Sequence, residues 1–359
     1  MNNKNVSWLC RLLAWFDTEK RSMPWRDSKD PYHILVSEIM LQQTRVDQAT
    51  PFYLRFIAKF PTIHDLASAS QDEVLEVWNG LGYYRRGRFL QQCAQIITQD
   101  NTMNYPDTYE AWLKLPGIGR YTAGAVMSIA FNKPCPAVDG NVARVISRFK
   151  GLDEDVAKDS AKNAIELWLK KVYPLDRCGD FTQALMELGA CVCFPKKPSC
   201  HQCPLADECY ASIHHKQEVL PVKMKKTPPE REIWGVFVIE EHEDIMLVAR
   251  KNEALLSDFW GLPMVKADTK LQMERAFFEK YHISVQVKQL LAETSHVFSH
   301  RRWNMKIYNA EKKTAGLVFK ENSDNQGIDY PIMIKLSEIK SINIAKPFKK
   351  VLEILEKNQ

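Results

Sequence analysis

The sequence predicts two folded domains of different class, an all-α domain over residues 1–215 and an α+β domain over residues 231–359. Apolar residues recur at helical spacing throughout the first part, whereas strand-like apolar runs occur only in the second. Between them, residues 216–230 contain a run of prolines and lysines without periodicity, which is typical of a linker. A chain of 359 residues has room for both domains, because a domain usually holds roughly 100–200 residues.

The composition is that of an ordinary globular protein with a mild excess of positive charge. Hydrophobic residues make up 45% of the chain and charged residues 26%, which supplies enough apolar material for real cores. The net charge of +5 permits a polyanionic partner but does not require one. No apolar run approaches the roughly 18 residues that span a bilayer, and the first residues lack the layout of a signal peptide. We therefore expect an intracellular protein.

Start signals mark several helices of the first domain. An apolar stripe over residues 8–16 predicts an N-terminal helix that faces the core. A capping box places an acid three residues after a capping side chain, and this pattern occurs at Ser70–Glu73 and again at Asp107–Glu110. Ser160 is a further candidate N-cap, because apolar residues follow it at helical spacing.

Strands and helices are interspersed in the second domain, which indicates an α+β fold. Ile233–Ile239 and Ile245–Val248 are typical of strands, and the acidic turn Glu241–Asp244 between them predicts a hairpin. Further strands are expected at Ile283–Leu290 and Met305–Ala310, and helices at Leu271–Lys280 and Pro347–Lys357.

A glycine-containing turn at Leu115–Gly119 interrupts one helical pattern and opens the next. In such a turn, Gly117 and Gly119 leave backbone N–H groups and the positive end of a helix dipole facing outward, which suits a phosphate. An isolated acid, Asp139, follows about 20 residues later at a second turn. This arrangement indicates a site that binds a phosphate backbone and places one carboxylate beside it.

Glu38 stands in a helical stretch, residues 35–45, that is apolar on nearly all sides. It is either an exposed residue or helix cap, or a carboxyl group among apolar neighbours. In the second case the neighbours raise its pKa, keep it protonated and make it a general acid. Glu38 and Asp139 would then form an acid and electrostatic pair, although an Asp at such a turn can also be only a turn residue or an N-cap.

Four cysteines form the pattern C-x6-C-x2-C-x5-C at the end of the first domain. Thiolates that converge from one short, loop-rich segment bind a metal ion or an iron–sulfur cluster. Zinc sites more often use two C-x2-C pairs and this segment has only one, but the residues alone do not separate zinc from a [4Fe–4S] cluster. The four expected ligands are Cys193, Cys200, Cys203 and Cys209.

Three ordered motifs make the chain resemble the helix-hairpin-helix DNA glycosylases that carry an iron–sulfur cluster. They are SEIMLQQTRV at residues 37–46, LPGIGRYTAGA at residues 115–125 with VDGN downstream, and the four-cysteine pattern. Within that superfamily the chain is similar to the MutY-type adenine DNA glycosylases over essentially its whole length.

The resemblance implies an all-α helix-hairpin-helix domain with a [4Fe–4S] cluster and a Nudix-like C-terminal domain. It implies double-stranded DNA with A:8-oxoguanine or A:G mispairs as the substrate. It also implies a DNA-associated monomer in the bacterial cytoplasm or nucleoid.

By resemblance, the chemistry falls to three residues. Glu38 is expected to protonate the adenine, while Asp139 and Tyr121 stabilise the positive sugar that develops as the base leaves. Gly117 and Gly119 are expected to hold the DNA backbone. Bifunctional relatives carry a lysine where this chain has Tyr121, so the nucleophilic amine is absent and a monofunctional glycosylase is expected.

Other positions match the family's substrate contacts one by one. The adenine pocket is expected to include Trp25, Arg26, Leu41 and Gln183. The wedge that fills the gap left by the flipped base is expected to include Gln43, Thr44 and Tyr83. Three arginines that follow are either a solvated helix face or phosphate contacts. They are Arg85, Arg86 and Arg88.

The loop Phe298–His300 of the second domain matches the element that recognises 8-oxoguanine in the family. Phe298 and Ser299 are expected to contact the lesion, and His300 a phosphate or a base edge; an ordinary connection between strands is the alternative. An active Nudix hydrolase needs a glutamate-rich, metal-binding helix, and Leu271–Lys280 does not supply one. We therefore expect this domain to read the lesion and not to hydrolyse nucleotides.

Three other functions agree with parts of this pattern. A bifunctional endonuclease III-like or thymine-mismatch glycosylase would share the scaffold. The presence of Tyr121 in place of a lysine and the presence of the second domain argue against this function. A non-catalytic DNA-binding iron–sulfur protein would not need Glu38 and Asp139 near a phosphate backbone that repels them. A nucleotide hydrolase would need metal ligands in the second domain, and the sequence does not supply them.

Overall fold

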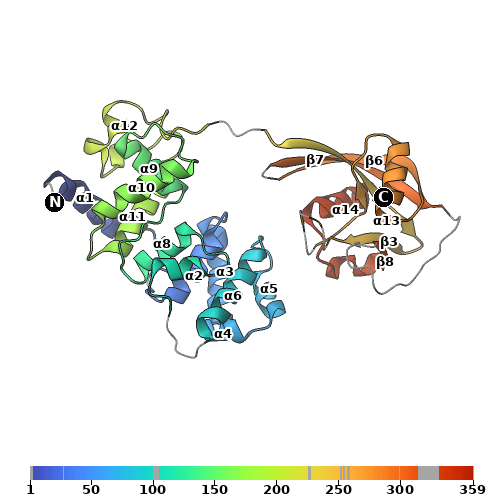
Figure 1. The fold of residues 1–359 in the computed structure, drawn as a ribbon, viewed down its shortest axis with the longest axis horizontal. Coiled ribbons are helices and arrows are strands. Elements are labelled where there is room, and N and C mark those ends of the chain that lie inside the picture. Colours follow the sequence, from blue (N-terminus) through green and yellow to red (C-terminus); the bar gives the residue numbers. More distant parts are fainter. Residues whose placement is uncertain are drawn as a thin grey trace. The chain divides into compact units, whose positions relative to one another are not determined.

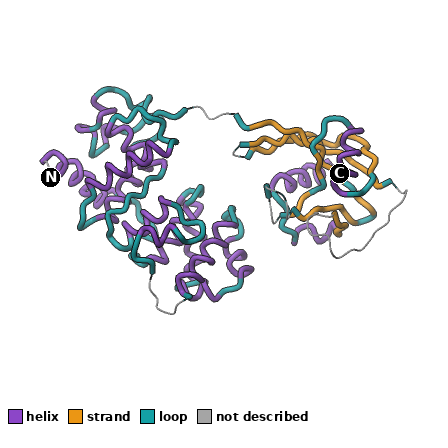
Figure 2. The backbone as a smooth tube through the Cα atoms, in the orientation of Figure 1, coloured by secondary structure: helices purple, strands orange, loops and turns teal. Residues whose placement is uncertain are grey.

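The computed structural model describes residues 3–26, 28–99, 105–224, 228–250, 253, 255–256, 259–298, 300–313 and 331–358. The chain divides into two compact units, Met1–Lys225 (unit 1) and Lys226–Gln359 (unit 2) (Figure 1). Unit 1 is helical, and unit 2 combines strands with helices (Figure 2). No helix in the described part of the chain combines the length and the apolar character needed to cross a membrane.

The described residues of unit 1 form α-helices joined by loops, with two short 3-10 helices near the C-terminal end of the unit. The helices of its first half are α1 (Asn3–Glu19), α2 (Pro31–Leu41), α3 (Val46–Lys59), α4 (Ile63–Ser68), α5 (Gln71–Trp78) and α6 (Arg85–Thr98). Those of its second half are α7 (Tyr109–Leu113), α8 (Arg120–Ile129), α9 (Gly140–Lys150), α10 (Asp159–Val172), α11 (Cys178–Cys191) and α12 (Tyr210–Ile213). The 3-10 helices are η1 (Cys200–Gln202) and η2 (Ala206–Glu208).

Two apolar clusters hold unit 1 together. The first is built from the helices between α2 and α8 and includes the fully buried rings of Phe56, Trp78 and Trp112. Most of α2 is buried in it, which explains why the sequence around Glu38 is apolar on nearly all sides. The second cluster joins α1 to α9, α10 and α11, and Trp8 within it confirms that the N-terminal helix faces the core.

The expected helix starts are partly confirmed. Ser70 and Glu73 form the capping box of α5, because each side chain accepts a hydrogen bond from the other's backbone N–H. α7 begins one position later than expected, because the Thr108 hydroxyl, and not the Asp107 carboxylate, accepts the capping hydrogen bond. The expectation for Ser160 is wrong, because this residue lies inside the first turn of α10 and its hydroxyl bonds to an upstream side chain.

The described residues of unit 2 form two β-sheets and two α-helices. The first sheet has the strand order β5-β1-β7-β6, with β1 and β7 parallel and the other pairs antiparallel. In the second sheet, β3 pairs with β2, β4 and β8. The strands are β1 (Glu230–Val238), β2 (Glu240–Glu241), β3 (Asp244–Ala249), β4 (Trp260–Gly261), β5 (Met264–Val265), β6 (Val285–Val297), β7 (Arg301–Lys312) and β8 (Pro331–Lys335). The helices are α13 (Lys270–Tyr281) and α14 (Lys346–Asn358), with a 3-10 helix η3 (Leu336–Ser341).

Each α-helix of unit 2 covers a separate apolar cluster. Phe277 and Tyr281 of α13 pack with Phe237 of β1, whereas Phe348 of α14 belongs to the cluster around Trp303 of β7. Neighbouring residues of a strand point to opposite faces, so one sheet contributes to both clusters. The expected helices and the strands β6 and β7 are confirmed, although both strands extend further than expected.

The hairpin expected between the first two strands of unit 2 is only partly correct. The acidic turn does join β2 to β3 as an antiparallel pair. β1 itself lies in the other sheet, where it pairs on one side with β5 and on the other with β7. β7 pairs along the whole of β1 and β5 pairs at Gly235 and Val236, so the backbone groups used in these pairs are not available to β3.

Candidate active site

Glu38 lies in the C-terminal half of α2, with almost no exposed surface. The residue is 6% exposed, and Oε2 has no hydrogen-bond partner among the described residues. Burial raises the pKa of Glu38 to about 7; a hydrogen bond from Tyr121 opposes the rise, and the nearby charge of Asp139 adds to it. Glu38 is therefore neither an exposed residue nor a helix cap. Its carboxyl group can hold a proton near neutral pH and deliver it to a bound base.

Tyr121 stands directly after the hairpin, in the first turn of α8. Burial raises its pKa well above the usual value, and the neighbouring carboxyl groups of Glu38 and Asp139 raise it further. Its hydroxyl also contacts Met186 Sδ at 3.8 Å. The phenol therefore stays protonated beside the two acids and is available as a hydrogen-bond donor.

Asp139 is the N-cap of α9, and its carboxylate is held firmly. It accepts hydrogen bonds from the backbone N–H of Val142 at 2.7 Å and from Asn141 Nδ2 at 2.9 Å. Burial raises the pKa of Asp139, while these hydrogen bonds and the charge of Arg144 oppose the rise. The cap therefore holds the carboxylate at a place where it also acts electrostatically on Glu38.

The turn between α7 and α8 leaves space at the start of α8. Gly117 has a φ of 72°, and an added Cβ there would lie 2.6 Å from the ring of Phe89, so a larger residue does not fit. Gly119 is the N-cap of α8, and apart from its chain neighbours no described heavy atom lies within 4 Å of a Cβ added there. The missing side chain at Gly119 thus serves no internal packing and leaves room for a backbone phosphate.

Glu187 on α11 is a buried acid that the sequence patterns did not single out. Its carboxylate accepts hydrogen bonds from Arg21 Nε at 2.7 Å and from Arg26 Nη2 at 2.6 Å. Burial acts to raise the pKa of Glu187, but the hydrogen bonds from the two arginines outweigh it and lower the pKa to about 2. Arg26, an expected pocket residue, is thereby held in place by a charged partner. Its one signal in the sequence was an acid in the apolar second half of α11, where Asp180 lies in the first turn.

The other expected pocket residues lie on or beside α2 and α11. Trp25 precedes α2, is 7% exposed and packs edge-on against Tyr53, with ring centres 5.2 Å apart. Leu41 ends α2 and Gln183 lies on α11, and both are partly exposed. α11 contacts α8, so the helix that carries Gln183 lies against the helix that carries Tyr121.

Gln43 and Tyr83, two expected wedge residues, have backbone angles that are uncommon outside glycine. The φ angle is 58° at Gln43 and 51° at Tyr83. Both side chains are exposed, Tyr83 by 61%, while the neighbouring Thr44 is partly buried. Non-glycine residues in this region persist only where the surrounding structure supports them.

Arg86 is partly buried and does not lie on a solvated helix face, because its guanidinium contacts the protein. Its guanidinium points inward and donates to the backbone carbonyls of Ile39 and Met40 at 2.9 and 3.0 Å. Carbonyls at the end of a helix lack partners within it and attract a cation. Arg85, in contrast, is exposed, with its guanidinium 4.9 Å from the ring centre of Phe89.

The four cysteines of the sequence motif gather at the end of unit 1. Burial raises the pKa of Cys203 to about 12, and the nearby thiols of Cys193, Cys209 and Cys200 add to the rise. Arg148 Nη1 donates to Cys193 Sγ at 3.2 Å. Four neighbouring thiols with a cation beside them fit a cluster whose binding displaces the thiol protons.

The cysteine loop is attached to α9, the helix that Asp139 caps. Arg144 Nε donates to the Cys193 carbonyl at 2.7 Å, and Arg148 Nη1 donates to the Phe194 carbonyl at 2.7 Å. Both arginines are buried.

No three of the described His, Cys, Asp or Glu side chains lie close enough together to ligate one metal ion. An iron–sulfur cluster differs from a single ion, because its thiolates bind to several irons.

The expected lesion-reading loop of unit 2 is described in part. The ring of Phe298 lies 4.7 Å from that of His296 and 4.7 Å from that of Trp303, so Phe298 packs against its own unit. His300 is exposed, and its carbonyl accepts a hydrogen bond from the first residue of β1 at 3.0 Å. Ser299 lies outside the described residues.

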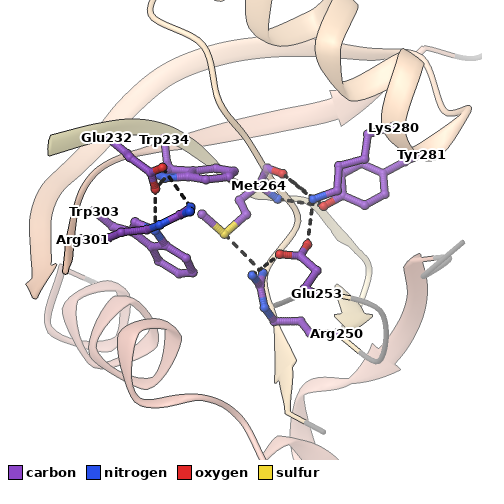
Figure 3. Close-up of polar contacts among 9 residues, drawn as sticks. All are labelled: Glu232, Trp234, Arg250, Glu253, Met264, Lys280, Tyr281, Arg301 and Trp303. Atoms are coloured by element: carbon purple, nitrogen blue, oxygen red, sulfur yellow. Dashed lines mark hydrogen bonds and ion pairs between the residues drawn. The ribbon is translucent and has the colours of Figure 1, made fainter. Parts of the chain in front are cut away.

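Glu232 of β1 is a buried acid that fixes the strand after this loop (Figure 3). Its Oε2 accepts hydrogen bonds from Trp303 Nε1 at 3.0 Å and from Trp234 Nε1 at 3.2 Å, and its Oε1 accepts one from Arg301 Nη1 at 3.2 Å. Burial acts to raise the pKa of Glu232, but Trp234 and the cations Lys266 and Arg301 outweigh it and lower the pKa. The end of the loop is therefore tied to β1 by charged hydrogen bonds.

Comparison with known proteins gives matches in both units. Residues 36–171 match the HhH-GPD superfamily of base excision DNA repair proteins, residues 193–209 the iron–sulfur binding domain of endonuclease III, and residues 235–354 the NUDIX domain. The adenine DNA glycosylase of Buchnera aphidicola subsp. Acyrthosiphon pisum is 33% identical over 97% of this chain and 97% of its own length. The chain belongs to the adenine DNA glycosylase family.

Members of the family from Arabidopsis thaliana and Homo sapiens are 36% and 35% identical over 83% of this chain. The chain spans only 55% and 65% of the length of these two relatives. The solved structure of a thermostable thymine-DNA glycosylase is 30% identical, with a TM-score of 0.53, and covers 59% of this chain and 98% of its own.

These matches confirm the expected fold class, a helix-hairpin-helix glycosylase domain followed by a Nudix-like domain. They also decide between the two candidates for the cysteine loop. The loop is an iron–sulfur binding motif, as the family resemblance implied, and zinc is set aside.

Proposed function

We propose that this chain, as a DNA-associated monomer, hydrolyses the N-glycosidic bond of adenine mispaired with 8-oxoguanine or guanine in double-stranded DNA. One observation carries the proposal: the buried carboxyl group of Glu38, with a pKa of about 7, lies beside Tyr121 and Asp139. Such a group is a general acid at neutral pH. Membership of the adenine DNA glycosylase family supports adenine as the base.

In the proposed reaction the adenine leaves the duplex, because a stacked and paired base cannot be reached. Glu38 donates its proton to the adenine ring, which makes the base a better leaving group. Positive charge develops on the sugar, and Asp139 stabilises it electrostatically, with the Tyr121 hydroxyl alongside. Water completes the hydrolysis, and the ionised Glu38 takes a proton from it.

The remaining residues bind and orient the DNA in this proposal. The backbone N–H groups around Gly117 and Gly119 hold a phosphate at the start of α8. The adenine lies among Trp25, Arg26, Leu41 and Gln183. The space it leaves in the duplex is filled by Gln43, Thr44 and Tyr83.

The cysteine loop serves DNA binding in this scheme and takes no part in the chemical step. When bound, the iron–sulfur cluster links the thiolates of Cys193, Cys200, Cys203 and Cys209 and so holds the loop in one shape. The loop also carries Lys196 and Lys197, which are exposed and suited to phosphate contact.

Unit 2 is proposed to read the opposite base through Phe298, Ser299 and His300. Nucleotide hydrolysis is not proposed, because the glutamates of α13 are engaged within the protein. Glu274 accepts hydrogen bonds from the Val287 backbone and from Lys313, and Glu279 pairs with Arg275.

Four duplexes test the base and its partner: A:8-oxoguanine, A:G, T:G and A:T, each incubated with the protein and then treated with alkali. We expect cleavage of the adenine strand in the first two only. Cleavage of T:G would favour a thymine-mismatch activity, to which the similar thymine-DNA glycosylase structure points as the second candidate. No cleavage of any duplex by protein that carries its cluster would refute the proposal.

Borohydride trapping tests whether the enzyme is monofunctional. Tyr121 offers a buried, protonated phenol and no amine, so a Schiff base with the sugar is not expected there. Product should accumulate without a trapped adduct, and an adduct that forms as fast as product would contradict the assignment.

Replacing His300 with alanine tests lesion reading. The exposed side chain contributes little to the fold, so the protein should stay folded. The preference for A:8-oxoguanine over A:G should fall, while the rate on A:G changes less. An unchanged preference would show that His300 does not contribute to recognition of 8-oxoguanine.

A further inference from the structure

Arg86 contacts the end of the helix that carries Glu38. It lies in the first turn of α6, and its Nη1 donates to the carbonyls of Ile39, Met40 and Gln42. α2 ends at Leu41, so these carbonyls lie at its C-terminal end, where the regular helical hydrogen bonds stop; the Ile39 carbonyl also accepts a bond from the Gln42 backbone N–H. A cation there also interacts favourably with the helix dipole.

The same guanidinium contacts both segments that form the proposed wedge. Its Nη2 donates to the Gly82 carbonyl at 3.1 Å and to Thr44 Oγ1 at 3.4 Å. Its central carbon lies 5.2 Å from the ring centre of Tyr83. These contacts stand next to the two left-handed positions, Gln43 and Tyr83. One side chain therefore supports two backbone segments that are unfavourable on their own.

Arg86 is partly buried and its guanidinium is surrounded by groups of the protein. Burial lowers its pKa, and no carboxylate is among the groups that act on it. Its charge is met by carbonyl oxygens and by the rings of Trp78 and Tyr83, at 5.7 and 5.2 Å. Such an arrangement suits a side chain that holds protein segments together better than one that meets a phosphate.

We propose that Arg86 is a positioning residue that holds both wedge segments and the C-terminal end of α2 in one arrangement, so that insertion of the wedge into DNA is coupled to the placement of Glu38. The inference rests on the proposed function, which supplies the roles of the wedge and the acid. No step of the reaction passes through Arg86 itself.

A direct phosphate contact is the competing role for an arginine at this place, and salt separates the two. Each phosphate contact that is lost reduces the slope of log affinity against log salt by about 0.9. Loss of a positioning residue leaves that slope unchanged. Arg85→Met is the matched control for Arg86→Met, because it removes the same charge from an exposed side chain one residue away.

Hydrogen exchange of the free protein tests the structural part without DNA. In Arg86→Met, the backbone amides of residues 42–44 and 82–84 should exchange faster together. In Arg85→Met both segments should keep their wild-type exchange. Arg86→Lys keeps a charge but loses the fork of donors, so its exchange should lie between those of wild type and Arg86→Met. If only one segment or neither changes in Arg86→Met, the proposal fails.

Single-turnover kinetics with bound duplex test the functional part. Arg86→Met should release adenine from A:8-oxoguanine at least about tenfold more slowly, because small misplacements of a catalytic group have large effects. The ratio of the Kd values of Arg86→Met for A:T and for A:8-oxoguanine should fall. The slope of log affinity against log salt should stay unchanged. Arg86→Lys should recover part of the rate. A wild-type rate and preference, or a salt slope that falls by about 0.9, would overturn the proposal.

The visible absorption of the cluster and the melting temperature show whether each variant is folded. If Arg86→Met does not fold, Arg86→Lys is used in its place for the same measurements. Wild-type hydrogen exchange together with a wild-type rate in Arg86→Lys would then overturn the proposal. If wild type releases no adenine at all, the proposed function fails, while hydrogen exchange still decides whether Arg86 supports both segments.

Discussion

Glu38 and Glu187 are two buried glutamates of unit 1 with opposite protonation behaviour. Glu38 is 6% exposed and Glu187 is 1% exposed. Burial raises the pKa of Glu38 to about 7, and no cation is among the groups that act on it. The same burial opposes ionisation of Glu187, but Arg21 and Arg26 outweigh it and lower the pKa to about 2. The difference teaches that the partner, and not the depth of burial, decides which acid can give up a proton at neutral pH.

Glu232 of unit 2 extends the comparison. It is 4% exposed, yet its pKa is lowered, because indole N–H groups and the cations Lys266 and Arg301 surround it. Glu187 and Glu232 are therefore ionised and serve to hold neighbouring side chains. Glu38 is the exception among these three, and its unpaired Oε2 is the feature that makes it suitable for acid catalysis.

Glu38→Gln should have the largest effect. The amide keeps the size of the side chain but carries no acidic proton, so single-turnover adenine release should fall about 1000-fold. Binding of the mispair should persist, which a gel-shift or anisotropy titration measures. A variant with a rate near that of wild type would end the role of Glu38 as the acid.

Glu187→Gln should lower the free energy of unfolding by about 3 kcal/mol, because it breaks a buried ion pair and leaves Arg26 without its charged partner. Urea unfolding at pH 8 measures this. Glu38→Gln is the matched control and should not lower stability at that pH, since it removes a buried acid that no cation stabilises. Equal losses in both variants would contradict the comparison.

Asp139→Asn should slow adenine release about 100-fold, which is about 2.7 kcal/mol, because it removes the charge that stabilises the sugar cation in the proposed mechanism. Asparagine is also a good N-cap, so α9 and the protein's melting temperature should change little. A large drop in melting temperature with an unchanged rate would assign Asp139 to capping alone.

The pH dependence should give the smallest effect. In the proposed mechanism the protonated form of Glu38 is the active one, so the single-turnover rate should be highest below about pH 7 and fall up to about tenfold for each further pH unit. The residual rate of Glu38→Gln should not decrease with pH in this way. A rate that rises with pH through 7 would mean that the ionised form acts.

Several features of the fold and the site were predictable because they depend on local pattern. The Ser70 capping box, the apolar helix around Glu38 and the glycines of the hairpin are encoded within a few residues of each other. The four cysteines likewise lie within one short segment that the family match covers. Such signals need no knowledge of distant contacts.

Other features depend on residues that are far apart in the sequence. Glu187 is 161 residues from Arg26, and Arg86 is 47 residues from Ile39. The sequence around Arg86 predicts only a basic helix start, and its inward direction follows from the carbonyls that α2 presents to it. Likewise, β1 pairs with β5 and β7, which are distant in the sequence, and no local sequence signal predicts these pairings.

The sequence by itself determined the family, the two-part organisation of helices followed by strands and helices, and the cysteine motif, because these are patterns of residue type and spacing. The tertiary structure decided which buried acid has a cation and which has none. The pKa of Glu38 and the pKa of Glu187 depend on groups that only folding brings together, and the charge of a carboxyl group responds to those neighbours over a few ångströms.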